Sequence, residues 1–150
     1  MAVAYGDESI VGLWQFTFTA KGNGLGGPPD GAPIDAGYVS WHGDGTELTN
    51  SGRDPSTSSF CMGVWKRIGY TEYKLNHWAL SWVPASASCT PLAGNSGCFL
   101  GPTNIQEDVI VDETGNNYSG PFTIDQYHQL STRWRTSPTT GHGYCVTPGL

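Results

Sequence analysis

Residues 14–19, WQFTFT, alternate strictly between aromatic and polar side chains near the start of the chain. A period of two residues is typical of a β-strand, because successive side chains point to opposite faces of a sheet. The pattern predicts a strand with Trp14, Phe16 and Phe18 on its apolar face and Gln15 and Thr17 on the other. The chain is therefore expected to build its core on one face of a sheet.

The composition also favours an all-β fold. The 150 residues suffice for one domain that buries a core. Six Trp, seven Tyr and five Phe supply large buried surfaces, while 21 Gly and 10 Pro indicate many turns. We expect a polar leader over residues 1–9 and a single domain over residues 10–150, in which residues 126–150 form the least regular part, the closing segment.

The charge excludes some classes of partner. Seven Lys and Arg against thirteen Asp and Glu give a net charge of −6, so the phosphate backbone of a nucleic acid would be repelled. No apolar run approaches the roughly 20 residues that cross a bilayer, and the first residues lack the basic and apolar regions of a signal peptide. Neither a nucleic-acid partner nor a membrane span is expected.

The four cysteines leave the cellular compartment open. No two of Cys61, Cys89, Cys98 and Cys145 have the two-residue spacing of a zinc knuckle or a thioredoxin-like motif. Cys89 and Cys98 bracket a turn-rich loop, and a disulfide there would favour an exported, periplasmic or secreted protein. Cys61 and Cys145 could form a second bond. The alternative is four unpaired thiols in a cytoplasmic protein.

The first hairpin is expected around Asp44-Gly45, a favoured two-residue turn. This turn would place His42 opposite Glu47 and Trp41 opposite Leu48. Trp41 and Leu48 would then lie on the apolar face, whereas His42 and Glu47 would face outward.

A second hairpin is expected from Phe60 to Trp82, with its turn near residues 68–70. On the returning strand, Tyr73, Leu75, His77 and Ala79 share one face. His77 is therefore the inward-facing histidine. The opposite face of this strand also carries large apolar side chains, those of Trp78, Leu80 and Trp82. We therefore expect either a bulge in the strand or a sheet that is covered on both faces there.

A third hairpin is expected with a loop closed by Asp112 opposite Asn117. Only this register separates the apolar side chains from the polar ones. Glu107 is then the single charged residue on an otherwise apolar face, while Asp125 faces water. Two further strands, 129–135 and 142–146, could close the sheet. The apolar face comprises Ile105, Val109, Val111, Tyr118, Phe122 and Ile124.

The inward positions of His77 and Glu107 support two interpretations of the interior. Burial among apolar groups raises the proton affinity of a carboxylate, so the pair could act as general acid and base. Alternatively, Glu107 accepts hydrogen bonds and orients one end of an apolar ligand. A metal site made of His42, His77 and Glu107 is disfavoured because His42 faces outward. No cofactor is expected, because the common phosphate-binding and catalytic motifs are absent.

Gly12-Leu13-Trp14 at the head of the first strand resembles the start of the lipocalins and related calycin barrels. Residues 39–47, 61–66, 73–78 and 118–125 are further similar to little-characterised bacterial lipocalin-like proteins. Asp125-Gln126-Tyr127 departs from the Thr-Asp-Tyr of lipocalins, and only Arg133 or Arg135 could supply their late arginine. The resemblance implies a cup-shaped barrel that holds a small hydrophobic molecule, with a long loop such as residues 20–35 at its mouth.

We therefore predict a single antiparallel up-and-down β-barrel of about eight strands that binds a small hydrophobic or aromatic molecule in its lumen. One alternative is a cofactor-free isomerase, lyase or hydrolase that uses His77 and Glu107. Another is a self-associating module, such as a homodimer, that presents exposed strand edges or the face of Trp78, Leu80 and Trp82 to another copy. The expected ligand contacts are Trp14, Phe16, Trp41, Tyr73, Tyr118 and Phe122.

Overall fold

The computed structural model describes residues 9–86, 88–127 and the backbone of residues 141–148. Of the leader expected over residues 1–9, only Ser9 is described, and the strand expected over residues 129–135 lies outside the described residues. The described chain forms eight β-strands and no helix. The strands are β1 (Gly12–Ala20), β2 (Pro33–Trp41), β3 (Thr46–Ser51), β4 (Phe60–Arg67), β5 (Glu72–Pro84), β6 (Gly97–Val111), β7 (Asn117–Gln126) and β8 (Gly141–Pro148).

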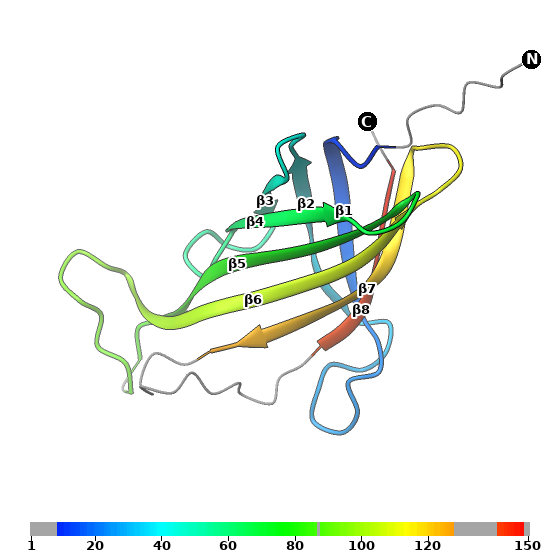
Figure 1. Ribbon diagram of the computed structural model, residues 1–150. Helices are drawn as coiled ribbons and strands as arrows, with labels where there is room; N and C mark the ends of the chain where they lie inside the picture. The colour runs from blue at the N-terminus through cyan, green and yellow to red at the C-terminus, as the bar shows by residue number, and fades with distance from the viewer. Residues whose placement is uncertain (1–8, 87, 128–140, 149–150) are drawn as a thin grey trace, which may run out of the picture.

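Each strand pairs with the next one along the chain, and β8 pairs with β1 to close the barrel (Figure 1). All the pairings are antiparallel, and the closing contact aligns Phe18 with Cys145. The prediction of an all-β, up-and-down barrel of about eight strands is confirmed. The short last strand expected at residues 142–146 is β8.

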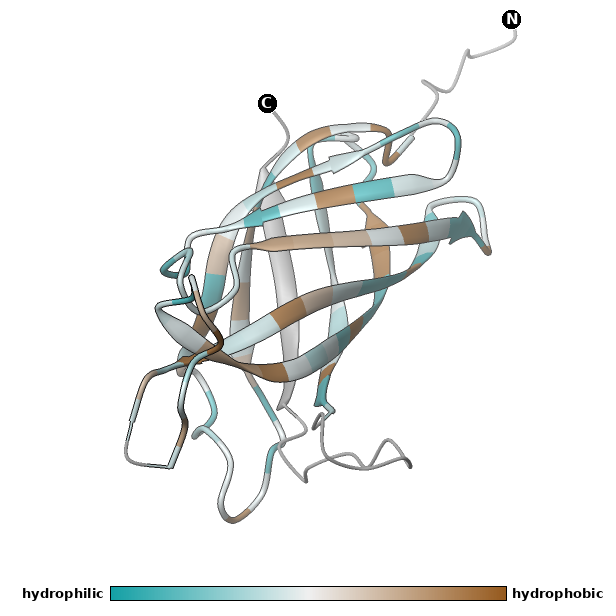
Figure 2. Ribbon diagram, turned by 90° about the vertical axis from the view of Figure 1, so that its left-hand side faces the viewer, coloured by the Kyte–Doolittle hydropathy of each residue, from teal (hydrophilic) through white to brown (hydrophobic). Residues whose placement is uncertain are grey.

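Side chains alternate between the barrel interior and its outer surface, and Figure 2 shows apolar and polar segments succeeding one another along the strands. On β5, Tyr73, Leu75, His77 and Ala79 are buried, whereas the residues between them are exposed. This confirms the facing expected for the second hairpin. The bulge expected farther along lies between Ser81 and Trp82, where the β5–β6 register shifts.

The two ends of the barrel differ in the length of their connections (Figure 1). Short turns at residues 42–45, 68–71 and 112–116 join the strands at one end, which we call the closed end. Longer connections at residues 21–32, 52–59 and 85–96 lie at the opposite end, which we call the mouth. The Gly/Pro-rich loop is therefore at the mouth, as the calycin resemblance implies.

Aromatic side chains fill the closed end. Trp14 packs edge-on against Tyr118, with ring centroids 5.2 Å apart, and its Nε1 donates a 2.7 Å hydrogen bond to the carbonyl of Ile10. Trp41 contacts both Tyr118 and Trp65. Because these rings occupy the closed end, a route into the interior starts at the mouth.

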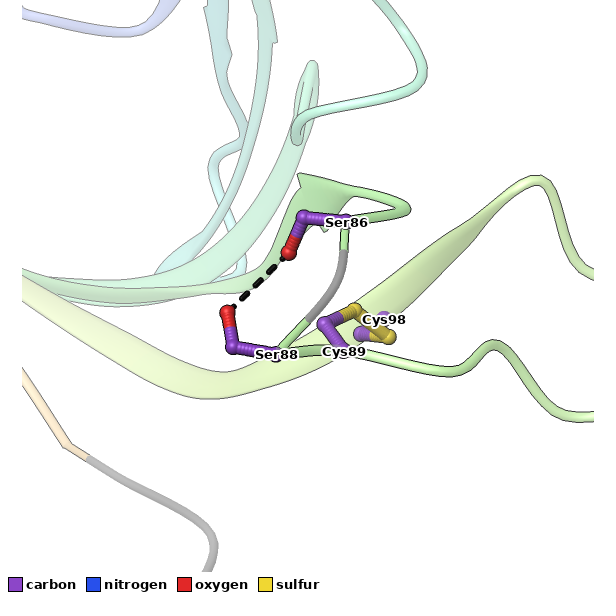
Figure 3. Close-up of a disulfide and its surroundings, with 4 residues drawn as sticks. All are labelled: Ser86, Ser88, Cys89 and Cys98. Carbon is purple, nitrogen blue, oxygen red and sulfur yellow. Dashed lines mark hydrogen bonds between the residues drawn. A yellow bond between two sulfur atoms is a disulfide. The ribbon is translucent and has the colours of Figure 1, made fainter.

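A disulfide joins Cys89 to Cys98, with the two Cα atoms 6.1 Å apart (Figure 3). It links the β5–β6 connection to the beginning of β6. The disulfide expected between Cys89 and Cys98 is therefore present, and the alternative of four unpaired thiols is wrong. Cys61 is a buried free thiol.

The register of the first hairpin differs from the sequence prediction by one residue. Trp41 pairs with Glu47 rather than with Leu48, so every β3 side chain lies on the face opposite to the one expected. Residues 43–45 form a three-residue loop in which the Gly45 amide donates to the carbonyl of His42, and Gly45 has a φ of 86°. This is the type I turn with a glycine bulge, a common alternative to a two-residue turn.

Candidate functional site

A pocket of about 330 Å³ opens at the mouth, among the long connections. Its volume is at the lower end of the range for small-molecule sites. Inward-facing residues of six strands supply much of its apolar wall, and loop residues such as Thr57 and Ser58 form part of the rim. The apolar strand residues of this mouth pocket are Phe18, Ile34, Cys61, Ala79, Trp82, Val83, Leu100, Ile105 and Ile124.

Two hydrogen-bonded groups interrupt the apolar wall of the mouth pocket. On one side, the Ser51 hydroxyl donates to the Asp35 carboxylate, 2.8 and 2.7 Å from its two oxygens. On the other side, the Thr103 hydroxyl lies beside that of Ser81 and donates to the side-chain oxygen of Gln126 at 2.6 Å. The pocket can therefore contact an apolar molecule and offers polar partners on two opposite walls.

A pair of buried ionisable groups lies deeper in the barrel. The Nδ1 atom of His77 on β5 is 3.2 Å from a carboxylate oxygen of Glu47 on β3, and the Thr49 hydroxyl donates to the other oxygen of Glu47. Gly63 of β4 lies between them, because it is aligned with Glu47 on one side and with His77 on the other. A Cβ at position 63 would be 2.4 Å from the His77 Cβ and 2.9 Å from Glu47 Oε2. The missing side chain thus lets the two groups meet across β4.

Glu107 of β6 is the third member of this buried cluster. Burial raises the pKa of Glu107 from 4.5 to about 7; the charge of His77 lowers this pKa and the charge of Glu47 raises it. Neither Glu107 Oε2 nor His77 Nε2 has a hydrogen-bond partner among the described residues, although both atoms are buried. The cluster therefore holds a carboxyl group poised near neutrality and two unused polar atoms, the features of a proton donor or acceptor.

Cys61 lies between the mouth pocket and the buried cluster. It lines the pocket, and burial together with the charges of Glu47, Asp35 and Glu107 raises the pKa of its thiol to about 12. A thiol with so high a pKa stays protonated and is a weak nucleophile. Cys61 therefore serves as an apolar wall residue.

The residues predicted to contact a ligand are all buried inside the barrel, but they lie below the mouth pocket. Phe16 and Phe122 both pack against Phe18, with ring centroids 4.9 and 4.2 Å away, and so support the pocket floor. The other four belong to the aromatic packing nearer the closed end and do not line the mouth pocket. These four are Trp14, Trp41, Tyr73 and Tyr118.

The charged residues of the interior agree with the sequence prediction only in part. His77 and Glu107 are inside the barrel, as expected, with 1% and 4% of their surfaces exposed. The prediction that Glu107 is the single charged residue inside is wrong, because Glu47 is 1% exposed. Its burial follows from the one-residue difference in register, which also places Leu48 outside. His42 remains in the exposed turn, where its Nδ1 lies 3.0 Å from the Thr46 hydroxyl.

Some functional candidates were missed in the sequence. Asp35 lies near the start of β2 and Ser51 at the end of β3, and no local pattern indicates that they meet. Gly63 could have been found, because a glycine within a strand often marks the close approach of neighbouring groups. A three-residue loop in the first hairpin predicts that Glu47 faces the barrel interior, as the structure shows.

A larger hollow, of about 450 Å³, lies on the outer surface across β4 to β7. Its lining is mixed: it includes the polar residues Lys66, Lys74, Asn76 and Gln106, the apolar residues Val64, Leu75 and Phe122, and Glu107 of the buried cluster. It offers an apolar molecule less contact than the mouth pocket does.

Within the described part of the chain, no three His, Cys, Asp or Glu side chains are grouped so that they could hold a metal ion. The described residues also include no helix long and apolar enough to cross a membrane. Comparison with protein-family models, curated proteins and solved structures found no match to the chain.

Proposed function

We propose that the barrel binds a small, mostly apolar molecule in the mouth pocket, in the manner of a lipocalin-like carrier. The main support is an apolar pocket of about 330 Å³ at the end where the long connections gather. Small-molecule sites typically combine such a lining with a few placed polar groups. Here the Asp35–Ser51 pair and the Thr103 hydroxyl would orient the polar ends of the molecule.

The aromatic residues below the pocket would give its floor a fixed shape. Phe18 would contact the ligand directly, and Phe16 and Phe122 would hold the Phe18 ring in place. Trp14, Trp41, Tyr73 and Tyr118 would contact a ligand only if it reached deeper than the mouth.

Binding can be tested with N-phenyl-1-naphthylamine, a neutral apolar dye whose fluorescence rises in apolar surroundings. The wild-type protein should bind the dye, and Ala79→Leu should weaken binding at least tenfold, roughly the effect of 1.4 kcal/mol, because Ala79 lines the pocket. The matched control is Ala36→Leu, at an exposed position of β2. Equal binding by the two variants, or no binding by the wild type, would contradict the proposal.

A second candidate function is proton transfer by the buried cluster, in an isomerase, lyase or hydrolase reaction without a cofactor. It is favoured by the pKa of Glu107, raised to about 7, and by the Glu107 Oε2 and His77 Nε2 atoms, which lack partners among the described residues. A carboxyl group with this pKa can take up and release a proton near neutral pH. A substrate that enters from the mouth would have to displace packed side chains, whereas Glu107 also lines the hollow across β4 to β7.

The ring opening of 5-nitrobenzisoxazole tests this second candidate, since it needs only a carboxylate shielded from water as a base. Glu107→Gln should abolish any activity, with a pH profile in the wild type that rises near pH 7. Glu113→Gln, in an exposed turn, is the control. Equal rates for wild type and Glu107→Gln would exclude Glu107 as the base.

A further inference from the structure

The outer surface of β4 and β5 carries a cluster of exposed apolar side chains, which we call the outer β4–β5 face. Its members lie next to one another across the two strands, because Met62 is aligned with Trp78 and Val64 with Asn76. They are between 44 and 61% exposed. A hollow of about 240 Å³, which Trp82 and Pro55 also line, lies among them. The face consists of Phe60, Met62, Val64, Trp78 and Leu80.

The outer β4–β5 face is large enough to form the apolar centre of a protein–protein interface. If a large side chain offers roughly 150–250 Å² when fully exposed, the five residues leave on the order of 500 Å² of apolar surface uncovered. Contiguous apolar patches this large on a single protein are often functional. A stable interface buries about 800 Å² on each partner, with an apolar centre and a polar rim. The face could therefore supply the centre, and flanking polar residues the rim.

The charges at the two ends of the face are complementary to each other. Toward the closed end, Lys66 lies directly opposite Lys74. Asp108 pairs with Lys74 at 3.0 Å, whereas Lys66 has no ion pair within the described part of the chain. Like charges directly opposite each other on adjacent strands repel. Toward the mouth, the exposed Asp54 precedes Pro55, which lines the hollow.

We propose that the outer β4–β5 face is the interface of a homodimer with a two-fold axis perpendicular to β4 and β5. In this arrangement the strands of the two copies run in opposite directions, so that the mouth end of each face lies over the closed end of the other. Lys66 of each copy then meets Asp54 of the other, and the apolar side chains pack at the centre. A two-fold interface requires such self-complementarity.

A second copy fits this face better than an anionic membrane does. The chain has a net charge of −6, and the exposed Asp54 lies at the mouth end of the face, next to Arg53, which lines the mouth pocket. A lipid surface would attract the Lys66 end and repel the Asp54 end. Only a partner that presents the opposite order of charges satisfies both ends, and a copy rotated by 180° does so.

Sedimentation velocity of the full chain over a range of concentrations tests the dimer. The mass should rise from 16.1 kDa toward twice that value. Met62→Glu should raise the dimer dissociation constant about thirtyfold or more, because it places a charge at the apolar centre. Leu13→Glu is the control, because Leu13 is 51% exposed on the outer face of β1 and lies outside the interface. Circular dichroism verifies that both variants are folded.

A charge exchange tests the orientation of the two copies. Lys66→Glu and Asp54→Lys should each weaken the dimer, and the double variant should restore dimerisation to within about threefold of the wild type, since the rim pairs contribute modestly. A mass that stays at 16.1 kDa up to about 1 mM, where even weak association is measurable, would overturn the proposal. So would equal effects of Met62→Glu and Leu13→Glu. Monomers that co-sediment with phosphatidylglycerol vesicles would overturn it in favour of a membrane surface.

Discussion

Gly63 is the residue that allows two buried ionisable side chains to meet across an intervening strand. Glu47 and His77 are two strands apart, and any side chain at position 63 would occupy the space between them. The contact satisfies the carboxylate of Glu47 in the barrel interior. A buried charge without such a partner is strongly destabilising.

Gly63→Ala is therefore expected to destabilise the protein by about 1–3 kcal/mol, the usual range for overpacking in a core. The added Cβ would lie 2.4 Å from the His77 Cβ. Urea unfolding followed by tryptophan fluorescence measures the change. Gly43→Ala is the matched control, since a Cβ there meets nothing within 4 Å. If both variants lose the same stability, the close approach at Gly63 has no energetic importance.

Glu107 should make the stability of the protein decrease as pH rises. Its pKa is about 7 in the folded state against 4.5 for the unperturbed group, so the folded state holds the proton more tightly. The free energy of unfolding should fall between about pH 4.5 and pH 7, by about 3 kcal/mol in total, and level off above pH 7. Glu107→Gln should remove this decrease and be more stable than the wild type at pH 8.

The pH series needs a control for the other carboxylates. Glu113→Gln, in an exposed turn, should keep the wild-type slope. Unfolding free energies at pH 5 and pH 8 are sufficient to compare the three proteins. A wild-type stability that rises over this interval and is unaffected by Glu107→Gln would show that Glu107 ionises normally.

At the scale of strands and turns, the hairpins differ in how much of their register the local sequence determines. The loop of the third hairpin is closed by its own residues, because the Asp112 carboxylate accepts hydrogen bonds from Thr114 and Asn117 within the loop. The sequence therefore predicted that register correctly, together with the inward positions of Glu107 and Phe122.

The first hairpin is held by a residue that lies far away in the sequence. Trp65 donates hydrogen bonds from Nε1 to the carbonyls of His42 and Thr46, and its amide donates to the carbonyl of Gly45. These bonds fix the three-residue loop and turn Glu47 inward. Since Asp-Gly is equally compatible with a two-residue turn, nothing within residues 38–49 alone reveals the choice. The buried cluster could therefore be predicted only in part.

The Cys89–Cys98 disulfide stabilises the β5–β6 connection. The two residues are nine positions apart, and the loss of a cross-link that closes a loop of this size costs about 2–3 kcal/mol. The variant Cys89→Ser/Cys98→Ser should unfold at correspondingly lower urea concentrations, and reduction of the wild type should have the same effect. Because such bonds persist in oxidising compartments, the disulfide favours the exported alternative.

A control separates the disulfide from the nearby turn. Ser86→Ala removes the 3.1 Å contact between the Ser86 and Ser88 hydroxyls and leaves the cross-link intact (Figure 3). It should change stability by less than about 0.5 kcal/mol, as surface substitutions usually do. Identical unfolding curves for the oxidised and reduced wild type would contradict the prediction.

At the scale of the whole molecule, closure of the barrel depends on β8. This strand pairs with β7 from Asn117 to Ile124 and with β1 from Phe18 to Ala20. The sequence indicated that a last strand here could close the sheet against the first one, but not its register, because alternation fades after residue 126. Closure leaves neither β1 nor β7 with a free edge along these segments.

Truncation after residue 127 should therefore expose the edges of β1 and β7 and cause aggregation. Size-exclusion chromatography and light scattering measure the loss of a defined species. Removal of residues 1–8, which precede every described strand, is the control and should preserve the wild-type elution. A truncated chain that elutes and unfolds like the wild type would show that the seven remaining strands are sufficient.

The separation of short turns and long connections between the two ends has a consequence for how such a protein can diversify. Residues 21–32 and 52–59 can be exchanged or lengthened without altering either the short turns that set strand alignment or the Cys89–Cys98 disulfide. Loop libraries grafted at these two positions should therefore change the surroundings of the mouth pocket on an unchanged scaffold of strands.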